Sequence, residues 1–383
     1  MNPLQKLPDP ARRSFRPPFC PNPDCAFHHP HPAWKAQKDG FFRRPSDQAL
    51  IQRFRCPHCH RRFSSQSFAT TYWLRYRRLL IPIARMICEG PGLRQLGRIL
   101  GISHKTVARH LARAGRHCLL FHHALRRNHP LQEPIVIDGF ESFEYSQFFP
   151  FHTNLAVGAH SWALYHFTDS PLRRKGTMTE RQRRRRTELE HCLGRPDPKA
   201  IERAITDLLH TLLPSVKGDR LELRSDDHPA YPRALARLRR DGTGHPPRIQ
   251  HQVTSSKEPR TPSNPLHPVN LTDLLLRHSH ANHRRETIAF SKRRQASHER
   301  TAIFTVWRNC IKKRREKESG AAETAAMRAG WTQKPWSWRR VLGRRLFPSQ
   351  IQLPPAWQAI YERSILTPIL GPHQSRHTCR YAY

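Results

Sequence analysis

Carboxylates are scarce in this sequence. Its 383 residues include 29 Asp and Glu against 67 Lys and Arg, which gives a formal net charge of +38. This balance produces long-range attraction to polyanions and favours nucleic acid over an anionic membrane as the partner. Because most carboxylates have a cation available, acids set in apolar, strand-like contexts need a different partner, and a divalent metal ion is the obvious one.

Long apolar runs and a regular cysteine framework are also missing. No apolar run approaches the roughly 20 residues of a membrane span, and the proline-rich, polar start of the chain lacks a secretory signal. We therefore expect no membrane association. Of nine cysteines, five are scattered: Cys88, Cys118, Cys192, Cys310 and Cys379. Such usage argues against disulfides and predicts a reducing cytoplasm in which DNA is accessible.

The other four cysteines form two turn-spaced pairs, Cys20 with Cys25 and Cys56 with Cys59. Each pair lets two thiolates face one tetrahedral Zn²⁺, and two pairs complete the coordination of a structural site. The sequence therefore predicts a zinc ribbon over residues 18–70, after a disordered basic tail at 1–17, and the metal would supply its folding energy. Four nearby histidines are interpreted as solvated neighbours: His28, His29, His58 and His60.

Residues 72–128 are expected to form a DNA-binding domain. Apolar residues recur at helical spacing from Leu93 to Leu111, the pattern breaks at Gly101, and Ser103 is a good N-cap for a second helix. Two short helices joined in this way predict a helix-turn-helix. Its second helix would present basic side chains to a DNA major groove: His104, Lys105, Arg109 and Arg113. The alternative is a helical hairpin whose basic residues only solvate one face.

From residue 130 the pattern becomes α/β. Strands are predicted at 135–137, 154–158, 162–167, 221–223 and 248–253, and helices at 197–209 and 230–240. The first and fourth strands stop at Asp138 and Asp226, so the fold can bring two aspartates together. Asp227 is the alternative to Asp226. An insertion at 170–196 with four consecutive arginines is either a helical arm on phosphate or a solvated segment.

This order of elements resembles the ribonuclease-H-like fold of DDE transposases, a mixed five-stranded sheet flanked by helices. The likeness is to bacterial insertion-sequence transposases with a zinc ribbon and a helix-turn-helix ahead of the catalytic domain, and it covers about residues 20–313. Its most specific parts are the runs 225–231 and 284–292. The second run looks like the Arg-Lys-Thr-x-x-Phe-Ser-Lys block of that family, with Asn309 and Lys312 near the place of a following Asn-Tyr-x-Lys element.

The third catalytic acid departs from the family pattern. Where the family has Glu followed three residues later by Asn, this sequence has Asn270 and Asp273. In one interpretation, Asp273 lies one helical turn further along than the family's Glu and reaches the same metal. In the other, Asn270 is the N-cap of the helix and Asp273 only interacts favourably with the helix dipole. The rival acid, Glu286, lies roughly 20 Å further along a continuous helix. Glu141 and Glu144 are interpreted as surface residues.

The resemblance implies a catalytic domain at 130–318 in which Asp138 bridges two Mg²⁺ ions, Asp226 holds one and Asp273 the other. It implies a transposase that cuts the ends of its own element and joins them to target DNA, as a homo-oligomer in the bacterial nucleoid. The alternative is a non-catalytic, sequence-specific DNA-binding protein derived from such a transposase. The tryptophan-rich, basic extension at 319–383 either clamps DNA or packs a small hairpin.

Overall fold

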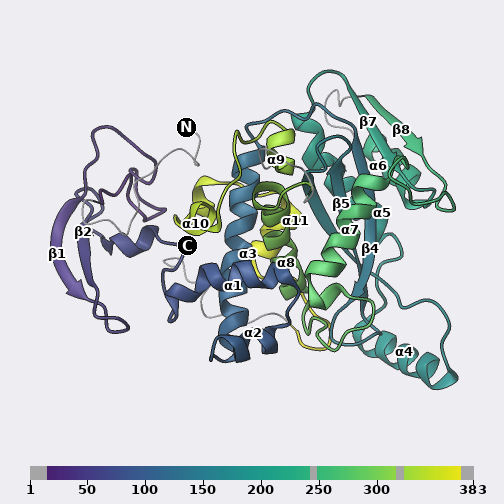
Figure 1. Cartoon of the computed structure of the whole chain (residues 1–383), viewed down its shortest axis with the longest axis horizontal. Helices are drawn as coiled ribbons and strands as arrows, with labels where there is room; N and C mark the ends of the chain where they lie inside the picture. The colour runs from purple at the N-terminus through teal and green to yellow at the C-terminus, as the bar shows by residue number, and fades with distance from the viewer. Residues whose placement is uncertain (1–14, 242–247, 316–322, 372–383) are drawn as a thin grey trace.

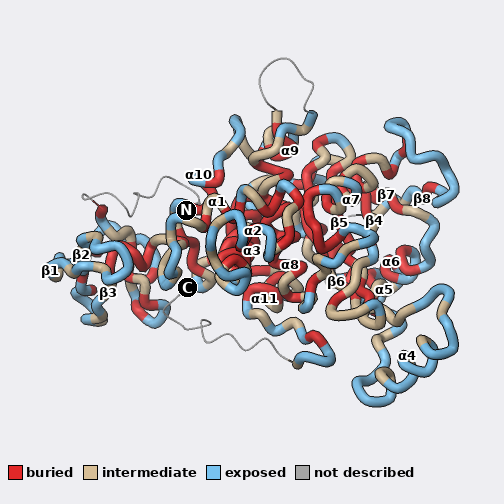
Figure 2. Tube along the Cα trace, turned by 60° about the horizontal axis from the view of Figure 1, so that its bottom comes forward, coloured by how far each residue is buried: buried red, intermediate tan, exposed pale blue. Residues whose placement is uncertain are grey.

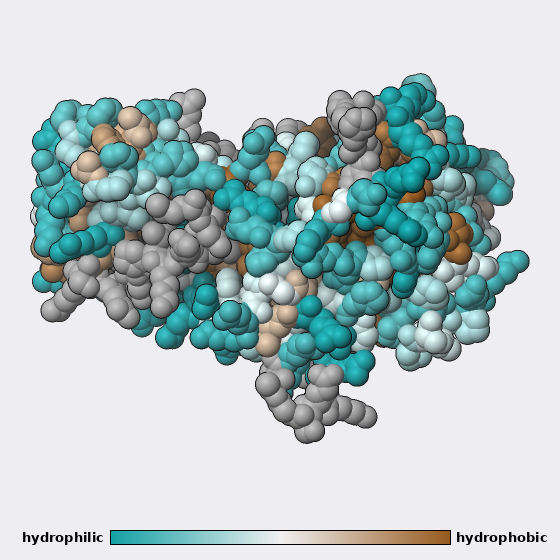
Figure 3. Space-filling model, turned by 90° about the horizontal axis from the view of Figure 1, so that it is seen from above, coloured by the Kyte–Doolittle hydropathy of each residue, from teal (hydrophilic) through white to brown (hydrophobic). Residues whose placement is uncertain are grey.

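The computed structural model of the chain describes residues 15–241, 248–315 and 323–371. Figure 1 shows a small β module at one end of the long axis, a helical middle, and an α/β half at the other end. None of the helices within these residues has the length and hydropathy that a membrane crossing requires. Seen from above, the surface is mostly hydrophilic, and its apolar residues gather in a few small patches (Figure 3).

The β module is a three-stranded antiparallel sheet. Its strands are β1 (Gln37–Arg43), β2 (Leu50–Arg55) and β3 (Arg62–Ser64), in that order. Most residues of β1 and β2 are exposed, and the module buries a cluster of five aromatic side chains: Phe15, Phe19, Phe54, Phe68 and Phe347. A core this small contributes little stability by itself, so another interaction must hold the module together.

The helical middle contains the predicted break between two helices. Helices α1 (Leu80–Met86) and α2 (Leu93–Ile99) precede α3 (His104–Arg126). Gly101 has a φ of +62°, a left-handed conformation that ends α2, and the Ser103 hydroxyl accepts a hydrogen bond from the Lys105 backbone N–H at 3.2 Å. The predicted N-cap is therefore confirmed.

Helix α3 is much longer than the short second helix that we expected. It runs for 23 residues, and its second half is buried (Figure 2). There it packs along α8 (Arg294–Val306). A Cβ at Gly115 would lie 2.2 Å from the Glu299 carbonyl oxygen, so only glycine permits this close approach. The sequence did not predict this length because histidines and arginines interrupt the apolar pattern of the helix after Leu111.

The α/β half is built on a mixed five-stranded sheet, as predicted. Its strands are β4 (Ile135–Phe143), β5 (Pro150–Gly158), β6 (Leu164–Pro171), β7 (Arg220–Ser225) and β8 (Arg248–Val253). The spatial order is β6-β5-β4-β7-β8; the first three strands pair antiparallel, whereas β7 runs parallel to both β4 and β8. Strand β4 continues five residues past Asp138, so this aspartate lies within the strand and not at its end.

Helices cover both faces of this sheet. Helix α5 (Ala200–Leu212) packs on β5 and β6, with α6 (Ala230–Arg240) beside it, and α7 (His267–Ser279) packs on β4 and β5. The predicted basic insertion forms α4 (Glu180–Leu193), which projects from the α/β half and buries no residue (Figures 1 and 2). Short turns of 3₁₀ helix lie at 65–68, 77–79, 87–89, 213–215, 281–283 and 348–350, and a π-helical turn at 307–311.

The C-terminal part completes the core instead of forming a separate hairpin. It contains α9 (Ala325–Arg328), α10 (Trp338–Leu342) and α11 (Pro355–Glu362). Trp331, Trp338 and Trp357 are buried, and the Trp357 indole donates to the Phe167 carbonyl at 2.9 Å. One continuous apolar core runs from Leu80 to Tyr361. These three tryptophans are therefore packing residues, unavailable for stacking on DNA.

Candidate metal centres

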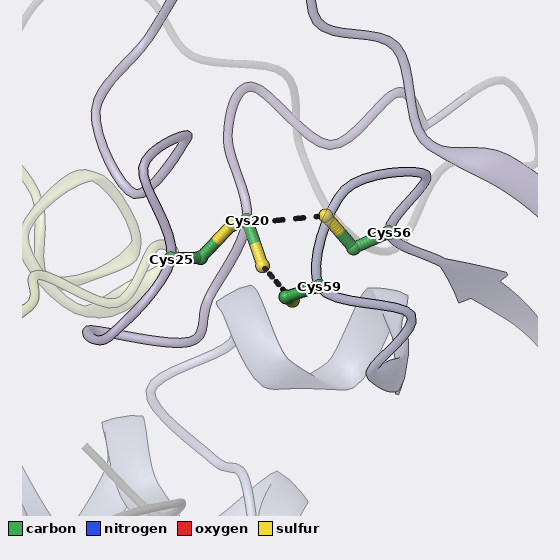
Figure 4. A group of neighbouring side chains, drawn as sticks. All are labelled: Cys20, Cys25, Cys56 and Cys59. Atoms are coloured by element: carbon green, nitrogen blue, oxygen red, sulfur yellow. Dashed lines mark hydrogen bonds between the residues drawn. The ribbon is translucent and has the colours of Figure 1, made fainter.

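The four cysteines of the β module come together (Figure 4). Cys20 and Cys25 lie in the loop before β1, and Cys56 and Cys59 lie in the turn between β2 and β3. The Sγ atoms of Cys20 and Cys59 are 3.6 Å apart, those of Cys25 and Cys56 are 3.9 Å apart, and all four sulfurs lie within 4.8 Å of one another. Tetrahedral Zn²⁺ with Zn–S distances of about 2.3 Å places its sulfurs about 3.8 Å apart. The cluster can therefore hold a structural metal such as zinc.

Without a metal ion, the surroundings of the cluster favour the thiolate of Cys56 but the neutral thiols of Cys20 and Cys25, whose pKa values burial raises. Although burial opposes ionisation, backbone N–H groups of Cys59 and His58 and the Trp34 indole lower the pKa of Cys56 to about 7. The indole donates to Cys56 Sγ at 3.4 Å. Burial raises the pKa of the Cys20 thiol, and repulsion from Cys56 and Cys59 adds to this rise. Such closely spaced sulfurs ionise together only around a metal ion.

One neighbouring histidine differs from our interpretation. His28 is buried, its Nδ1 donates to the Cys20 carbonyl at 2.8 Å, and its Nε2 accepts from the Ser349 hydroxyl at 2.6 Å. It is therefore not a solvated neighbour: it fixes the first cysteine turn against the C-terminal part of the chain. Sequence reasoning missed this role because Ser349 lies 321 residues away.

A second candidate centre lies where β4 and β7 run side by side. Their parallel register pairs Val136 with Arg224, so two residues further along, Asp138 is level with Asp226, directly after the end of β7. Neighbouring strands lie about 4.8 Å apart, and residues two apart on a strand share a face. The sheet thus brings the two predicted aspartates to adjacent positions.

The third predicted aspartate approaches the same place from α7. Burial, followed by the charge of Asp226, raises the pKa of Asp138 to about 6, against a hydrogen bond that the Gly139 N–H donates. Burial and the charge of Asp138 raise the pKa of Asp273 well above its usual range. The phenol of Tyr231 is affected by all three carboxylates, which together with burial raise its pKa. Asp138, Asp226 and Asp273 therefore all lie near enough to Tyr231 for their charges to act on its phenol.

These carboxylates have few partners. Asp138 Oδ1 accepts from the Gly139 N–H at 2.7 Å, Asp226 Oδ1 accepts from the His228 N–H at 3.0 Å, and the buried Oδ1 of Asp273 has no hydrogen-bond partner. None of the three forms an ion pair with a Lys or Arg that the structure describes, although the chain carries a charge of +38. Buried oxygen atoms left without a proton donor fit the preferences of a hard divalent cation.

The aspartates are spaced more widely than the cysteines. Across the described ranges 15–241, 248–315 and 323–371, the cysteine cluster is the one group of three or more ligand residues whose ligand atoms all lie within 4.8 Å. In a two-ion centre, however, only one carboxylate bridges, and the outer two each hold a separate ion. Arg277 and Arg260 act on Asp273 from nearby and lower its pKa, a smaller effect than burial. The three carboxylates therefore do not form a closed cage like that of the cysteines.

The other acidic candidates lie elsewhere. Asp227 is exposed, and a hydrogen bond from Ser256 lowers its pKa, so it is held by the loop after β8. Glu286 is exposed beyond the end of α7, and Glu141 is exposed on β4. Glu144, which we interpreted as a surface residue, is buried: its carboxylate accepts from the Arg294 N–H at 2.6 Å and from the Thr367 hydroxyl.

The capping interpretation of Asp273 is wrong. Helix α7 begins at His267 with Leu266 at the N-cap, four residues earlier than an Asn270 cap requires. The Asn264 side chain accepts from the Leu266 N–H at 2.8 Å and supports the turn before the helix. Asp273 therefore lies in the second turn, too far from the helix start to serve as an N3 acid.

The predicted DNA-contacting residues divide into two groups. His104, Lys105 and Arg109 are exposed on the first two turns of α3. Arg113 is half-buried and donates to the Thr70 carbonyl at 3.3 Å, so it contacts its own chain instead of pointing outward. Three side chains of α3 thus remain available to a partner.

A scan against protein-family models finds no match to the chain, and a search of the curated proteins finds no similar one. Function is therefore inferred from the residues and their geometry.

Proposed function

We propose that this protein is a DDE-type transposase that uses Mg²⁺ to cut the ends of its own insertion element and to join them to target DNA. The observation that carries the proposal is the meeting of Asp138, Asp226 and Asp273, half-buried and without ion pairs to described cations. The strand order β6-β5-β4-β7-β8 supports a ribonuclease-H-like assignment, because it has the three antiparallel and two parallel strands expected from the resemblance.

The chemistry needs a nucleophile activated and a leaving oxyanion stabilised. When bound, two Mg²⁺ ions about 4 Å apart supply both functions. Asp138, Asp226 and Asp273 would hold the ions, and Asp138 lies level with Asp226 where β4 and β7 run side by side. With a pKa of about 6, Asp138 is largely ionised at neutral pH and available as a ligand.

The rest of the molecule supplies DNA binding in this proposal. The charge of +38 attracts DNA from a distance, and the exposed His104, Lys105 and Arg109 would contact it at the end of the element. The zinc ribbon would add a second contact. Assembly of copies on DNA, and residence in the nucleoid of a bacterial cytoplasm, belong to the same proposal, because two element ends must be joined in one reaction.

The test is an in vitro cleavage assay. The full chain with bound Zn²⁺ is mixed with a DNA fragment that carries the gene and its natural flanking sequence, with or without added Mg²⁺. Mg²⁺-dependent nicks at both element ends, followed by joining to a second plasmid, are the expected result. Asp138→Asn should abolish both steps, whereas Glu141→Gln, an exposed acid on the same strand, should not.

One result would replace the proposal with its alternative. If the wild-type chain binds the flanking DNA specifically but never nicks it under any divalent cation, the protein is a non-catalytic DNA-binding relative. The departure from the family pattern at Asn270 and Asp273 gives this alternative its specific motive, because the third acid of the family stands at a different position.

A further inference from the structure

A cleft of about 820 Å³ separates the start of the helix-turn-helix from the segment that follows α7. One wall is formed by α2 and the first turns of α3, and the other by residues 284–293 and the start of α8. Its lining includes apolar and basic side chains: Leu93, Arg94, Arg98, Arg284, Ile288, Phe290 and Lys292. Neither metal centre contributes to its lining.

The rim of the cleft is cationic from both sides. Arg94 and Arg98 are exposed on α2, and Arg284 and Lys292 are exposed on the opposite segment. No ion pair with a carboxylate is found for these four among the residues that the structure describes. The one exposed acid in the lining is Glu286, since Glu299 is buried and paired with Arg363 at 2.9 Å. The rim therefore complements a polyanion.

The inside of the cleft is apolar, which a groove for phosphates alone does not require. Ile288 is fully exposed, at 100% of its possible surface, although it stands in a segment of charged residues. Phe290 and Leu93 are half-buried beside it, and Lys292 Nζ lies 4.5 Å from the centre of the Phe290 ring. Apolar and aromatic surfaces next to cations are the features that bind unpaired bases together with their phosphates.

The segment that forms the second wall is anchored at both ends. At its start, the Arg284 guanidinium donates to the Gly90 carbonyl at 3.4 Å, and directly after Ile288 the Ala289 methyl lies so close to Gly92 that a Cβ on this glycine would be 3.3 Å away. Near its end, the Ser291 carbonyl accepts from the Tyr145 N–H at 2.9 Å, and its hydroxyl accepts from the buried Arg300. Phe290 also contacts Phe143, the last residue of β4, with ring centres 5.3 Å apart. The exposure of Ile288 thus belongs to a held wall that adjoins the strand of Asp138.

We propose that this cleft binds a short unpaired segment of a DNA strand, with bases against Ile288 and Phe290 and phosphates on the four cations. The proposal rests on the proposed function and specifies the form of its DNA substrate: the strand is separated from its complement next to the helix-turn-helix. A double helix keeps its bases stacked inside and cannot use the apolar wall. The volume lies within the range of roughly 300–1,000 Å³ that encloses a ligand of a few rings.

The test measures binding without catalysis. The full chain, with Zn²⁺ bound and without Mg²⁺, is added to a labelled single-stranded oligothymidine of about six nucleotides. The fluorescence anisotropy of the label measures binding. Ile288→Asn should weaken this binding about tenfold and leave binding of a duplex of the same length unchanged, because only an unpaired base reaches the wall. Val253→Asn, at an exposed apolar residue of β8, is the matched control and should bind as the wild type.

The charged rim has its own variant. The double change Arg94→Ala with Arg98→Ala should weaken single-strand binding about tenfold and lower the slope of log affinity against log salt by about 1 to 1.5. Removing the same charge from α4, with Arg181→Ala and Arg183→Ala, should change single-strand affinity less than about twofold. Both α4 residues are exposed.

Two outcomes would overturn the inference: an Ile288→Asn variant that binds the single strand like the wild type, or a duplex that competes with it equally well. Either would make the cleft a phosphate contact only. The outcome is separable from that of the cleavage assay, because no aspartate of the proposed centre lines the cleft. Single-strand binding without cleavage would remove the transposase and keep the cleft; cleavage without Ile288-dependent binding would do the reverse.

Discussion

The cysteine cluster and the aspartate centre are two opposite ways to place anionic ligands. Four sulfurs lie within 4.8 Å of one another on two tight turns, whereas the three carboxylates come from β4, the residue after β7, and α7, and form no cluster this tight. Four thiolates would leave a bound metal no open position. On the proposed function, the more widely spaced carboxylates would leave ligand positions for water and a phosphate.

Without bound metal, the two centres should contribute differently to the free energy of folding. The small sheet that carries the cysteines buries little core, so a metal bound by them would supply much of its stability. The aspartates lie beside an extensive core that folds without them, and their burial next to one another is a cost to the fold. Metal removal should thus unfold one region and only strain the other.

The largest effect is expected at the cysteines. Cys56→Ser, or chelation of zinc, should remove a stabilisation of roughly 10 kcal/mol from the β module, because metal binding and folding are coupled there. Zinc content should fall from one ion per chain to none, and limited proteolysis should cut within residues 15–70 while the α/β half resists. Cys192→Ser, at an exposed cysteine of α4, is the control. A resistant module without zinc would contradict the comparison.

At the aspartates, activity should be lost without unfolding. Asp138→Asn and Asp226→Asn should each lower the rate of strand cleavage by roughly three orders of magnitude or more, because a bridging or terminal ligand is lost. DNA affinity and the circular dichroism spectrum should match those of the wild type. Normal cleavage by either variant would show that the carboxylates do not hold the catalytic ions.

Asp273 tests which acid completes the centre. Asp273→Asn should lose nearly all activity, and Glu286→Gln should keep it, because Asp273 lies near enough to Asp138 for that charge to raise its pKa, whereas Glu286 is exposed beyond the end of α7. Since Asp273 lies in the second turn of α7, its replacement should not show the roughly 1 kcal/mol loss expected for a cap. Thermal unfolding measured together with cleavage distinguishes the two roles; an inactive Glu286→Gln would reassign the third ligand.

Asp138→Asn should also make the chain more stable when no Mg²⁺ is bound. The pKa of Asp138 is about 6 in the folded chain, against 3.8 as its ordinary value, so ionisation opposes folding. This cost is absent below about pH 4, grows as pH rises, and approaches 3 kcal/mol above about pH 6. Melting curves of the chain with Zn²⁺ bound and without Mg²⁺ should therefore favour the variant at pH 7 but not at pH 4. Mg²⁺ should raise the melting temperature of the wild type only.

The smallest effects are expected on α3. Lys105→Ala and Arg109→Ala should each weaken DNA binding by roughly 1–2 kcal/mol, with sequence dependence if either residue contacts a base. Arg113→Ala should instead lower stability, because its guanidinium bonds the Thr70 carbonyl. Binding measured at several salt concentrations separates base from phosphate contacts. Unchanged affinity for both exposed variants would move recognition elsewhere, most simply to α4.

Local sequence signals predicted the parts of the molecule that local interactions determine. The cysteine spacing, the N-cap at Ser103 and the bounds of β8 depend on a few neighbouring residues, and each was predicted correctly. The mixed five-stranded sheet followed from the order of apolar runs. The assignment of Asp138 and Asp226 as partners came from the same order, and the parallel register now places them side by side.

Features that depend on distant residues were missed. Glu144 is buried because Arg294 and Thr367 come to it from 150 and 223 residues away. The second half of α3 is buried because α8 packs on it. No residue near Gly115 in the sequence indicates its close contact with the Glu299 backbone. Tyr231 is the last residue of the run 225–231, but its proximity to three carboxylates is visible only in the folded chain.

The unbroken length of α3 has a geometric consequence. One end of this helix carries His104 and Lys105 at the surface, and near the other end His122 Nε2 lies 3.0 Å from the Leu164 carbonyl of β6. At 1.5 Å per residue, the 23 residues span about 35 Å without a hinge. If the surface end holds DNA and the sheet cuts it, α3 acts as a ruler. The number of base pairs between the recognised sequence and the cut would then be constant, set by the protein and not by the DNA.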